Sequence, residues 1–247
     1  MAYENVFKRY EKKYLVSALT KKRLLAEMNK YMQPDEYPRS VISNIYYDND
    51  ENTLIRRSLD KPVFKEKFRL RSYCVPKDDT TVFLEIKRKY KGVVYKRRVG
   101  LTYKSAESFM HNDTLPDTSR LDFAGKQILK EIEYFKAMYD PKPFAFVGYE
   151  RVSLAGKDGL ELRITFDDNI RTRNTDLRLS DGDYGQFLLD PGMCLMEIKA
   201  YGAYPMWLTR ALSENKLYPV SFSKIGEYYT GCSEIYKGDN APCLQVY

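Results

Sequence analysis

The sequence has little of what most enzymes use for acid–base or nucleophilic chemistry. His111 is the only histidine in 247 residues, so a mechanism built on a histidine base has one candidate. The sequence identifies no orienting partner for it, which favours a surface role. The four cysteines, Cys74, Cys194, Cys232 and Cys243, are far apart, and no Cys-x-x-Cys pair is present. We therefore expect four free thiols, with no zinc site and no thioredoxin-like motif.

Long apolar runs are also absent. No run approaches the ~18 apolar residues that a membrane span needs, and the first residues contain no apolar signal-peptide stretch. We therefore expect a cytoplasmic protein without a transmembrane segment, although a membrane protein partner stays open. The net charge of +7 comes from 41 Lys and Arg against 34 Asp and Glu. This moderate excess favours an anionic ligand, but it does not separate nucleic acid from nucleotide or polyphosphate.

The main local pattern is the alternation of charged or aromatic residues with apolar ones, which is typical of β-strands. It predicts an α+β protein of mainly antiparallel β structure. We expect one domain over 1–247, with its core over about 5–230 and a loosely packed tail at 231–247. Helical spacing of apolar residues predicts helices at 20–32, 122–139 and 205–215. The predicted strands lie near 5–16, 41–48, 63–74, 81–90, 92–102, 144–154, 159–170 and 193–201.

Several of these strands carry charges at every second position, and both signs occur. A sheet whose charged face meets water would explain any single strand. Seven strands with the same habit instead favour a closed barrel with its charged residues inside. The predicted inner face has eight cations and three carboxylates, and a polyanion such as triphosphate would balance the excess. The cations are Lys13, Arg69, Arg71, Lys87, Arg98, Arg151, Arg163 and Lys199, and the carboxylates are Glu11, Glu85 and Glu197.

The residue types suit phosphate. An arginine fork donates two parallel hydrogen bonds to phosphate, and a lysine acts as a point charge. Carboxylates that face phosphates need a divalent cation between them, and Mg²⁺ or Mn²⁺ bridging Glu and phosphate oxygens is the ordinary solution.

The same residues carry a family resemblance. Seven segments, in order from about residue 5 to 230, resemble the VTC domain, the polyphosphate polymerase domain of the vacuolar transporter chaperone family. This domain belongs to the triphosphate tunnel metalloenzymes, the CYTH-like superfamily. One position departs, because Ser221 stands where the eukaryotic synthase has a lysine. The segments are Arg-Tyr-Glu-Lys-Lys-Tyr (9–14), Ile-Tyr-Tyr-Asp (45–48), Phe-Arg-Leu-Arg-Ser-Tyr (68–73), Phe-Leu-Glu-Ile-Lys-Arg (83–88), Tyr-Glu-Arg (149–151), Leu-Met-Glu-Ile-Lys (195–199) and Phe-Ser-Lys (222–224).

The resemblance implies an eight-stranded triphosphate-tunnel barrel with flanking helices. It implies a transferase that moves the γ-phosphate of ATP onto a growing polyphosphate chain with Mn²⁺ or Mg²⁺. Glu197 would hold the metal, with Glu85 and Glu11 as further ligands. Arg69, Arg71, Lys87 and Lys224 would act in catalysis. The implied phosphate-binding residues are Lys13, Arg69, Arg71, Lys87, Arg98, Tyr149, Arg151, Arg163, Lys199, Ser223 and Lys224.

Two competing functions remain open at this point. A hydrolase of the same fold would cleave triphosphate or short polyphosphate, with water as the acceptor and Glu11 or Glu85 orienting it. A non-enzymatic module would bind polyanions or RNA, using some of the 22 Tyr and 12 Phe for stacking. We expect no sequence-specific binding of nucleic acid. The direction of the reaction, the product length, the preferred metal, the oligomeric state and the regulation do not follow from the sequence.

Overall fold

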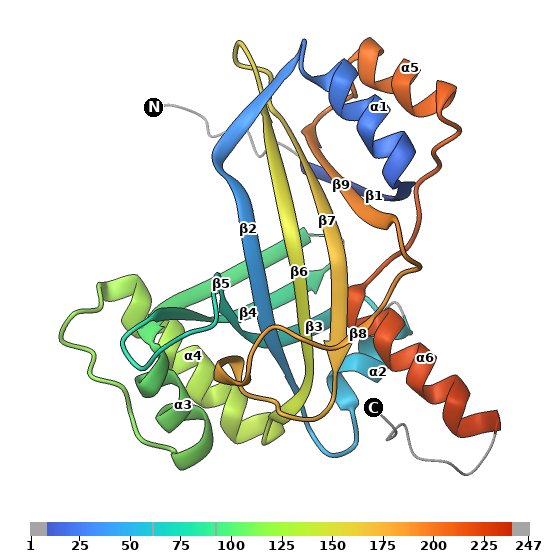
Figure 1. Cartoon of the computed structure of the whole chain (residues 1–247). Coiled ribbons are helices and arrows are strands. Elements are labelled where there is room, and N and C mark those ends of the chain that lie inside the picture. Colours follow the sequence, from blue (N-terminus) through green and yellow to red (C-terminus); the bar gives the residue numbers. More distant parts are fainter. Residues whose placement is uncertain (1–8, 61, 92, 239–247) are drawn as a thin grey trace. The chain divides into compact units, whose positions relative to one another are not determined.

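The chain divides into two compact units. The computed structural model describes the backbone of residues 9–60, 62–91 and 93–238 (Figure 1). The first unit comprises residues up to 41, 149–170 and 189–222, and the second comprises 42–148, 171–188 and the residues from 223 onward. Each unit has its own apolar core.

The first unit is built on strands β1 (Arg9–Ser17) and β9 (Met193–Tyr201), which pair antiparallel. Helices α1 (Ala18–Met28) and α5 (Met206–Glu214) pack on their apolar face, as Figure 1 shows. Ser17 ends β1 and caps α1, because its side chain accepts a hydrogen bond from the Thr20 amide. The core includes Tyr14, Leu24, Met28, Phe166, Met196, Ile198 and Leu208.

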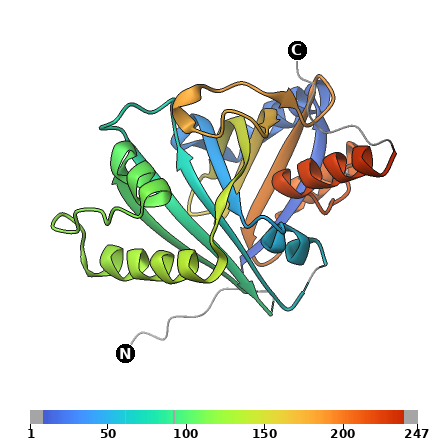
Figure 2. The same ribbon diagram turned by 90° about the horizontal axis from the view of Figure 1, so that it is seen from below.

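The second unit contains an antiparallel meander of β3 (Phe64–Ser72), β4 (Thr81–Tyr90) and β5 (Val93–Thr102). Helices α3 (Tyr103–Asn112) and α4 (Phe123–Tyr139) cover its apolar face (Figure 2). The apolar residues of α4 recur at helical spacing and pack against alternate residues of β3 and β4. The other face of the meander is therefore left to the charged residues. The remaining elements are α2 (Thr53–Leu59), the 3₁₀ helix η1 (Leu179–Asp181), β8 (Gln186–Phe187) and α6 (Lys224–Gly238).

Three long strands contribute residues to both units: β2 (Met32–Asp48), β6 (Lys142–Gly156) and β7 (Leu162–Arg173). The strand order is β1-β9-β7-β6-β2-β3-β4-β5, with β8 paired to β7. The mainly antiparallel α+β fold with eight principal strands is confirmed. Over the described residues, however, β1 and β5 end the order and do not pair with each other. Hydrogen bonding does not close the sheet, so the prediction of a closed barrel is wrong on this point.

The sequence missed three helices, α2, α3 and α6. Helix α3 follows β5 without an intervening loop, so no turn signal in the sequence marks where the helix begins. Thr102 ends that strand and accepts a hydrogen bond from the Ser105 amide, which makes it the helix cap. Helix α6 covers 224–238, so the first half of the predicted loose tail is helical, and 239–247 lie outside the described residues. Among the described helices, none is long and apolar enough to cross a membrane.

Candidate functional site

The charged face of β3–β5 is organised as two rows across three strands. One row is Lys67, Lys87 and Lys96, which stand directly opposite one another on neighbouring strands. The next row replaces the central lysine by a carboxylate and consists of Arg69, Glu85 and Arg98. Directly opposed like charges destabilise a sheet. A row of three lysines therefore indicates a face that is built to receive negative charge.

Glu85 is the only carboxylate in these two rows, and it is surrounded by cations. It is almost fully buried, and its oxygens lie 2.7 Å from Arg69, 2.8 Å from Lys96 and 3.8 Å from each of Arg71 and Arg98. Burial alone would raise the pKa of Glu85, but Arg69, Arg71 and Lys96 lower it from 4.5 to about 2. Glu85 is therefore ionised at any physiological pH and acts as an internal counter-charge.

One carboxylate does not balance this face. Eight cations share this face, so the local charge stays strongly positive until an anion binds. Arg98 is held in place by an aromatic ring, because its guanidinium carbon lies 3.4 Å from the centre of the Phe83 ring. The eight cations are Lys65, Lys67, Arg69, Arg71, Lys87, Lys89, Lys96 and Arg98.

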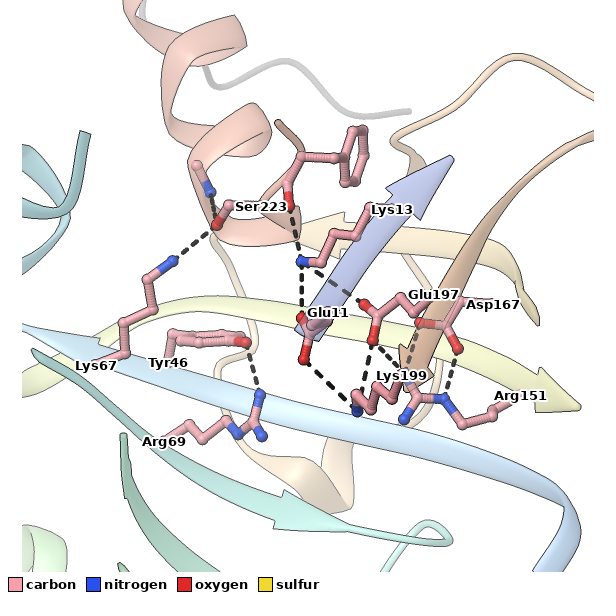
Figure 3. A network of polar contacts seen from close by, with 12 residues as sticks. Glu11, Lys13, Tyr46, Lys67, Arg69, Arg151, Asp167, Glu197, Lys199 and Ser223 are labelled. Carbon is pink, nitrogen blue, oxygen red and sulfur yellow. Dashed lines mark hydrogen bonds and ion pairs between the residues drawn. The ribbon is translucent and has the colours of Figure 1, made fainter. Parts of the chain in front are cut away.

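The start of α6 adds polar groups in the same unit. Lys67 Nζ donates a hydrogen bond of 2.8 Å to Ser223 Oγ, which Figure 3 shows. Ser223 Oγ also accepts from the Gly226 amide, so this side chain caps α6. Lys224 is the first residue of the helix and is nearly buried.

The first unit carries a second cluster, in which lysines and glutamates alternate. Lys13 is directly opposite Glu197, and Glu11 is directly opposite Lys199, on β1 and β9. Lys13 Nζ lies 3.9 Å from Glu11 and 3.7 Å from Glu197, and Lys199 Nζ lies 3.8 Å and 3.9 Å from the same carboxylates. Figure 3 shows the four side chains converging. Lys13 also donates to the Phe222 carbonyl at 2.8 Å, which fixes its ammonium group.

Arg151 joins this cluster from β6. Its Nη2 lies 3.9 Å from Glu197, and its guanidinium binds both oxygens of Asp167 at 2.6 and 2.7 Å. Asp167 is fully buried, so this two-point ion pair is strongly oriented. Tyr149 lies beside the guanidinium, with its ring centre 5.2 Å away.

Arg163 has its own partner. Its Nε lies 2.6 Å from Asp35 on β2, and its side chain stays 45% exposed. In the strand register Arg163 stands directly opposite Lys199, so it adjoins the lysine–glutamate cluster. Every arginine that the sequence predicted for the site is therefore paired with a carboxylate of its own unit.

The donors of this lysine–glutamate cluster in the first unit fit a hard divalent cation. Two carboxylates, Glu11 and Glu197, lie around the same pair of ammonium groups. Thr165 stands directly opposite Glu197, and its buried hydroxyl oxygen has no hydrogen-bond partner among the described residues. Mg²⁺ is usually held by one or two carboxylates together with phosphate oxygens and water. Within the described residues no group of three or more acidic, His or Cys side chains forms a complete cage, so substrate oxygens would have to finish the coordination.

Glu85 is less suited to a metal, because four cations already surround it. Its place among Arg69, Arg71, Lys96 and Arg98 explains its presence without a metal ion.

Sequence reasoning missed several residues that the site uses. Lys67 and Lys96 share the predicted charged faces and lie one row from the predicted arginines. Asp35 and Asp167 bind Arg163 and Arg151. A period-2 count marks Lys67, Lys96 and Asp167 as members of a face, but choosing them requires the cross-strand register. Asp35 carries no local signal, because its partner lies on a distant strand.

Comparisons with known proteins identify the family of the chain. The model of the VTC domain family matches residues 8–235. No curated protein sequence matches the chain. Among solved structures, a candidate adenylyl cyclase from Hippeastrum, described as having a dominant triphosphatase activity, is 14% identical with a TM-score of 0.51. The match covers 91% of this chain and 96% of that one. A candidate adenylate cyclase from Bacillus halodurans is also 14% identical, with a TM-score of 0.49 over 86% of this chain and 92% of that one.

Proposed function

Because this chain belongs to the VTC domain family, we propose that it is a polyphosphate polymerase that transfers the γ-phosphate of ATP onto a growing polyphosphate chain. The observation that supports this most directly is the charged face of β3–β5, where eight cations accompany one carboxylate, Glu85. Such an excess is costly unless a polyanion binds there. ATP, triphosphate and polyphosphate all supply this charge, and we further propose that the protein acts in the cytoplasm.

The chemistry needs no histidine. The terminal oxygen of the acceptor chain attacks the γ-phosphorus of ATP, the bond from that phosphorus to the β–γ bridging oxygen breaks, and ADP leaves. The attacking oxygen is already anionic, so no strong base is required. Phosphoryl transfer depends mainly on positioning and charge stabilisation. We assign the charge stabilisation to Arg69, Arg71, Lys87 and Lys224.

The remaining site residues would bind phosphate and metal. Lys13, Lys199, Arg151 and Arg163 supply positive charge in the first unit, and Tyr149 and Ser223 supply hydroxyl groups. Glu197 and Glu11 would hold Mn²⁺ or Mg²⁺, with Thr165 beside them. The metal, when bound, would neutralise charge on phosphate oxygens.

A polyphosphate gel tests the proposal. Purified protein is incubated with ATP and Mn²⁺ or Mg²⁺, and long anionic chains are expected. Arg98→Ala should lower synthesis by roughly tenfold or more, because it removes a charge-assisted contact of about 1.5–3 kcal/mol. Arg97→Ala is the matched control: Arg97 is the preceding residue on β5, faces the opposite side and binds Glu131 at 2.6 Å. Equal activity in both variants would contradict the assignment of this face.

A hydrolase is the second candidate. Glu11 is about one-third exposed, so this carboxylate reaches solvent beside two lysines and could orient water. The Hippeastrum protein with a similar fold is described as a triphosphatase, which keeps this alternative in view. Release of inorganic phosphate from triphosphate, without long chains from ATP, would favour hydrolysis. Tight binding without turnover would favour the non-enzymatic module.

A further inference from the structure

Two residues of β2 hold the arginine pair of β3 from the side. Tyr46 stands directly opposite Arg69, and Asn44 directly opposite Arg71, in the β2–β3 register. Arg69 Nη1 donates to the Tyr46 hydroxyl at 2.9 Å (Figure 3), and Arg71 Nε donates to Asn44 Oδ1 at 2.9 Å. Each arginine therefore has a neutral oxygen partner from β2, although neither partner was foreseen as a site residue.

Arg69 is clamped between this phenol and a carboxylate. On its other side, Nε donates to Glu85 at 2.8 Å and Nη2 lies 2.7 Å from the same oxygen. A guanidinium has five N–H donors in a fixed plane, so fixing three directions sets where the others point. Glu85 thus fixes one side of the Arg69 guanidinium, and Tyr46 fixes the other. Because its oxygen accepts from Arg69, its own proton is directed elsewhere.

The charges around Tyr46 are mostly positive. Lys67, Arg69 and Arg71 face it from β3, while its own strand supplies the neutral Asn44, and Glu85 on β4 is engaged by the two arginines. Burial alone would raise the pKa of Tyr46, but Arg69, Lys67 and Arg71 outweigh it and lower the pKa from 10.0 to about 8. Tyr46 is therefore poised to ionise at mildly alkaline pH when no anion is bound.

We propose that Tyr46 is a phosphate-binding and positioning residue, whose neutral hydroxyl holds Arg69 and donates its proton to a phosphate oxygen, and whose phenolate form opposes phosphate binding. This rests on the proposed function, in which Arg69 grips phosphate. A phenolate would repel phosphate, and it would form an ion pair with Arg69 that neutralises the guanidinium charge. The neutral form keeps Arg69 fixed while leaving its charge available.

The proposal fixes the direction of a pH effect. Bound phosphate adds negative charge beside Tyr46, which raises its pKa. Binding above about pH 8 therefore takes up a proton, and affinity falls as pH rises, with a limiting slope of about tenfold per pH unit. Below about pH 7 the phenol is already protonated, so its ionisation no longer makes the affinity depend on pH.

Three variants separate Tyr46 from its neighbours. Tyr46→Phe keeps the ring and removes the hydroxyl. Tyr47→Phe is the matched control, because Tyr47 is the adjacent residue, points into the apolar core against Phe68, and has a pKa that burial raises. Tyr73→Phe is also needed, because burial raises the pKa of Tyr73 but Arg71 and Arg98 lower it overall.

Two measurements are made on each protein. The first follows the ultraviolet absorbance of tyrosinate between about pH 6 and pH 10, with and without triphosphate. Wild type and Tyr47→Phe should show an ionisation step near pH 8 that triphosphate moves upward, and Tyr46→Phe should lack it. The second is calorimetric titration with triphosphate. Tyr46→Phe should bind about fivefold more weakly near pH 7, because a net hydrogen bond contributes about 1 kcal/mol.

The pH profile then tests the role of Tyr46 separately from the proposed function of the protein. Lys96, whose pKa burial lowers, also loses charge at high pH, so the decisive quantity is the difference between wild type and Tyr46→Phe. A steeper loss of affinity in wild type supports the proposal. If wild type binds triphosphate, Arg69→Ala does not, and Tyr46→Phe keeps both the wild-type profile and the tyrosinate step, the role of Tyr46 is refuted while the proposed function stands. If wild type does not bind triphosphate, both fail.

Discussion

A substitution at Glu85 tests the charged face directly, because four cations have this one carboxylate as their counter-charge. Glu85→Gln removes the charge and keeps the shape. A fall of the pKa from 4.5 to about 2 corresponds to roughly 3 kcal/mol of stabilisation of the ionised form. A protein of this size loses roughly 2–4 °C in Tm per kcal/mol. We therefore expect the variant to melt roughly 6–12 °C below wild type at pH 7.

The pH dependence provides a second readout. The pKa of Glu85 is depressed in the folded state, so its stabilisation is complete above about pH 4.5 and is lost as the pH falls toward 2. Wild type should lose this contribution over that window, and the variant has none to lose. The two melting temperatures should therefore converge as the solution becomes acidic.

Triphosphate should narrow the gap at neutral pH. The ligand supplies the negative charge that the variant lacks, so it should raise the Tm of Glu85→Gln more than that of wild type. Differential scanning calorimetry with and without triphosphate measures all three effects. Glu51→Gln is the control, because Glu51 is an exposed carboxylate of the same unit. If Glu85→Gln melts like Glu51→Gln at every pH, the carboxylate does not stabilise the cation cluster and the reasoning fails.

Three further predictions concern single residues. Arg69→Ala should weaken triphosphate binding by roughly ten- to a hundredfold in calorimetric titration, while Arg97→Ala leaves it unchanged. Equal affinities in the two variants would show that Arg69 does not bind phosphate. Glu197→Gln should abolish metal-dependent turnover with only a modest loss of triphosphate affinity, and surviving turnover would leave Glu197 as an ion-pair partner of Lys13, Lys199 and Arg151 without a metal role. Asp167→Asn should cost about 3–5 kcal/mol in denaturant unfolding because it removes the two-point carboxylate partner of the largely buried Arg151 and leaves Glu197 at 3.9 Å; a loss below 1 kcal/mol would contradict this.

The strands were predictable because their period-2 pattern is strong. Each of the eight predicted strands overlaps an observed one. The period-2 spacing also predicts that Arg69, Arg71 and Lys87 share one face of the sheet, and the β3–β4 register agrees. The pattern of α4 was equally clear, since its apolar residues recur at helical spacing. These are local signals, and local spacing decides which way a side chain points.

The partners of the charged residues were not predictable in the same way. Asp35 and Arg163 meet on β2 and β7, and their pairing depends on strand order and register rather than on any local pattern. The roles of Tyr46 and Asn44 follow from the β2–β3 register for the same reason. The open sheet order is likewise a property of which edges meet, and a strand pattern does not encode it.

The carboxylates change how the excess of positive charge should be understood. Arg69 binds Glu85, Arg151 binds Asp167 and Arg163 binds Asp35, each at 2.6–2.8 Å. These pairs fix guanidinium orientation before any ligand arrives, which reduces the conformational entropy lost on binding. The row of Lys67, Lys87 and Lys96 contains no carboxylate, and Lys96 is paired with Glu85 of the next row at 2.8 Å. Lysine is a point charge with little directional demand. Under the proposed function, this row would attract a phosphate chain in many positions, and the oriented arginines would select the phosphates that lie in line.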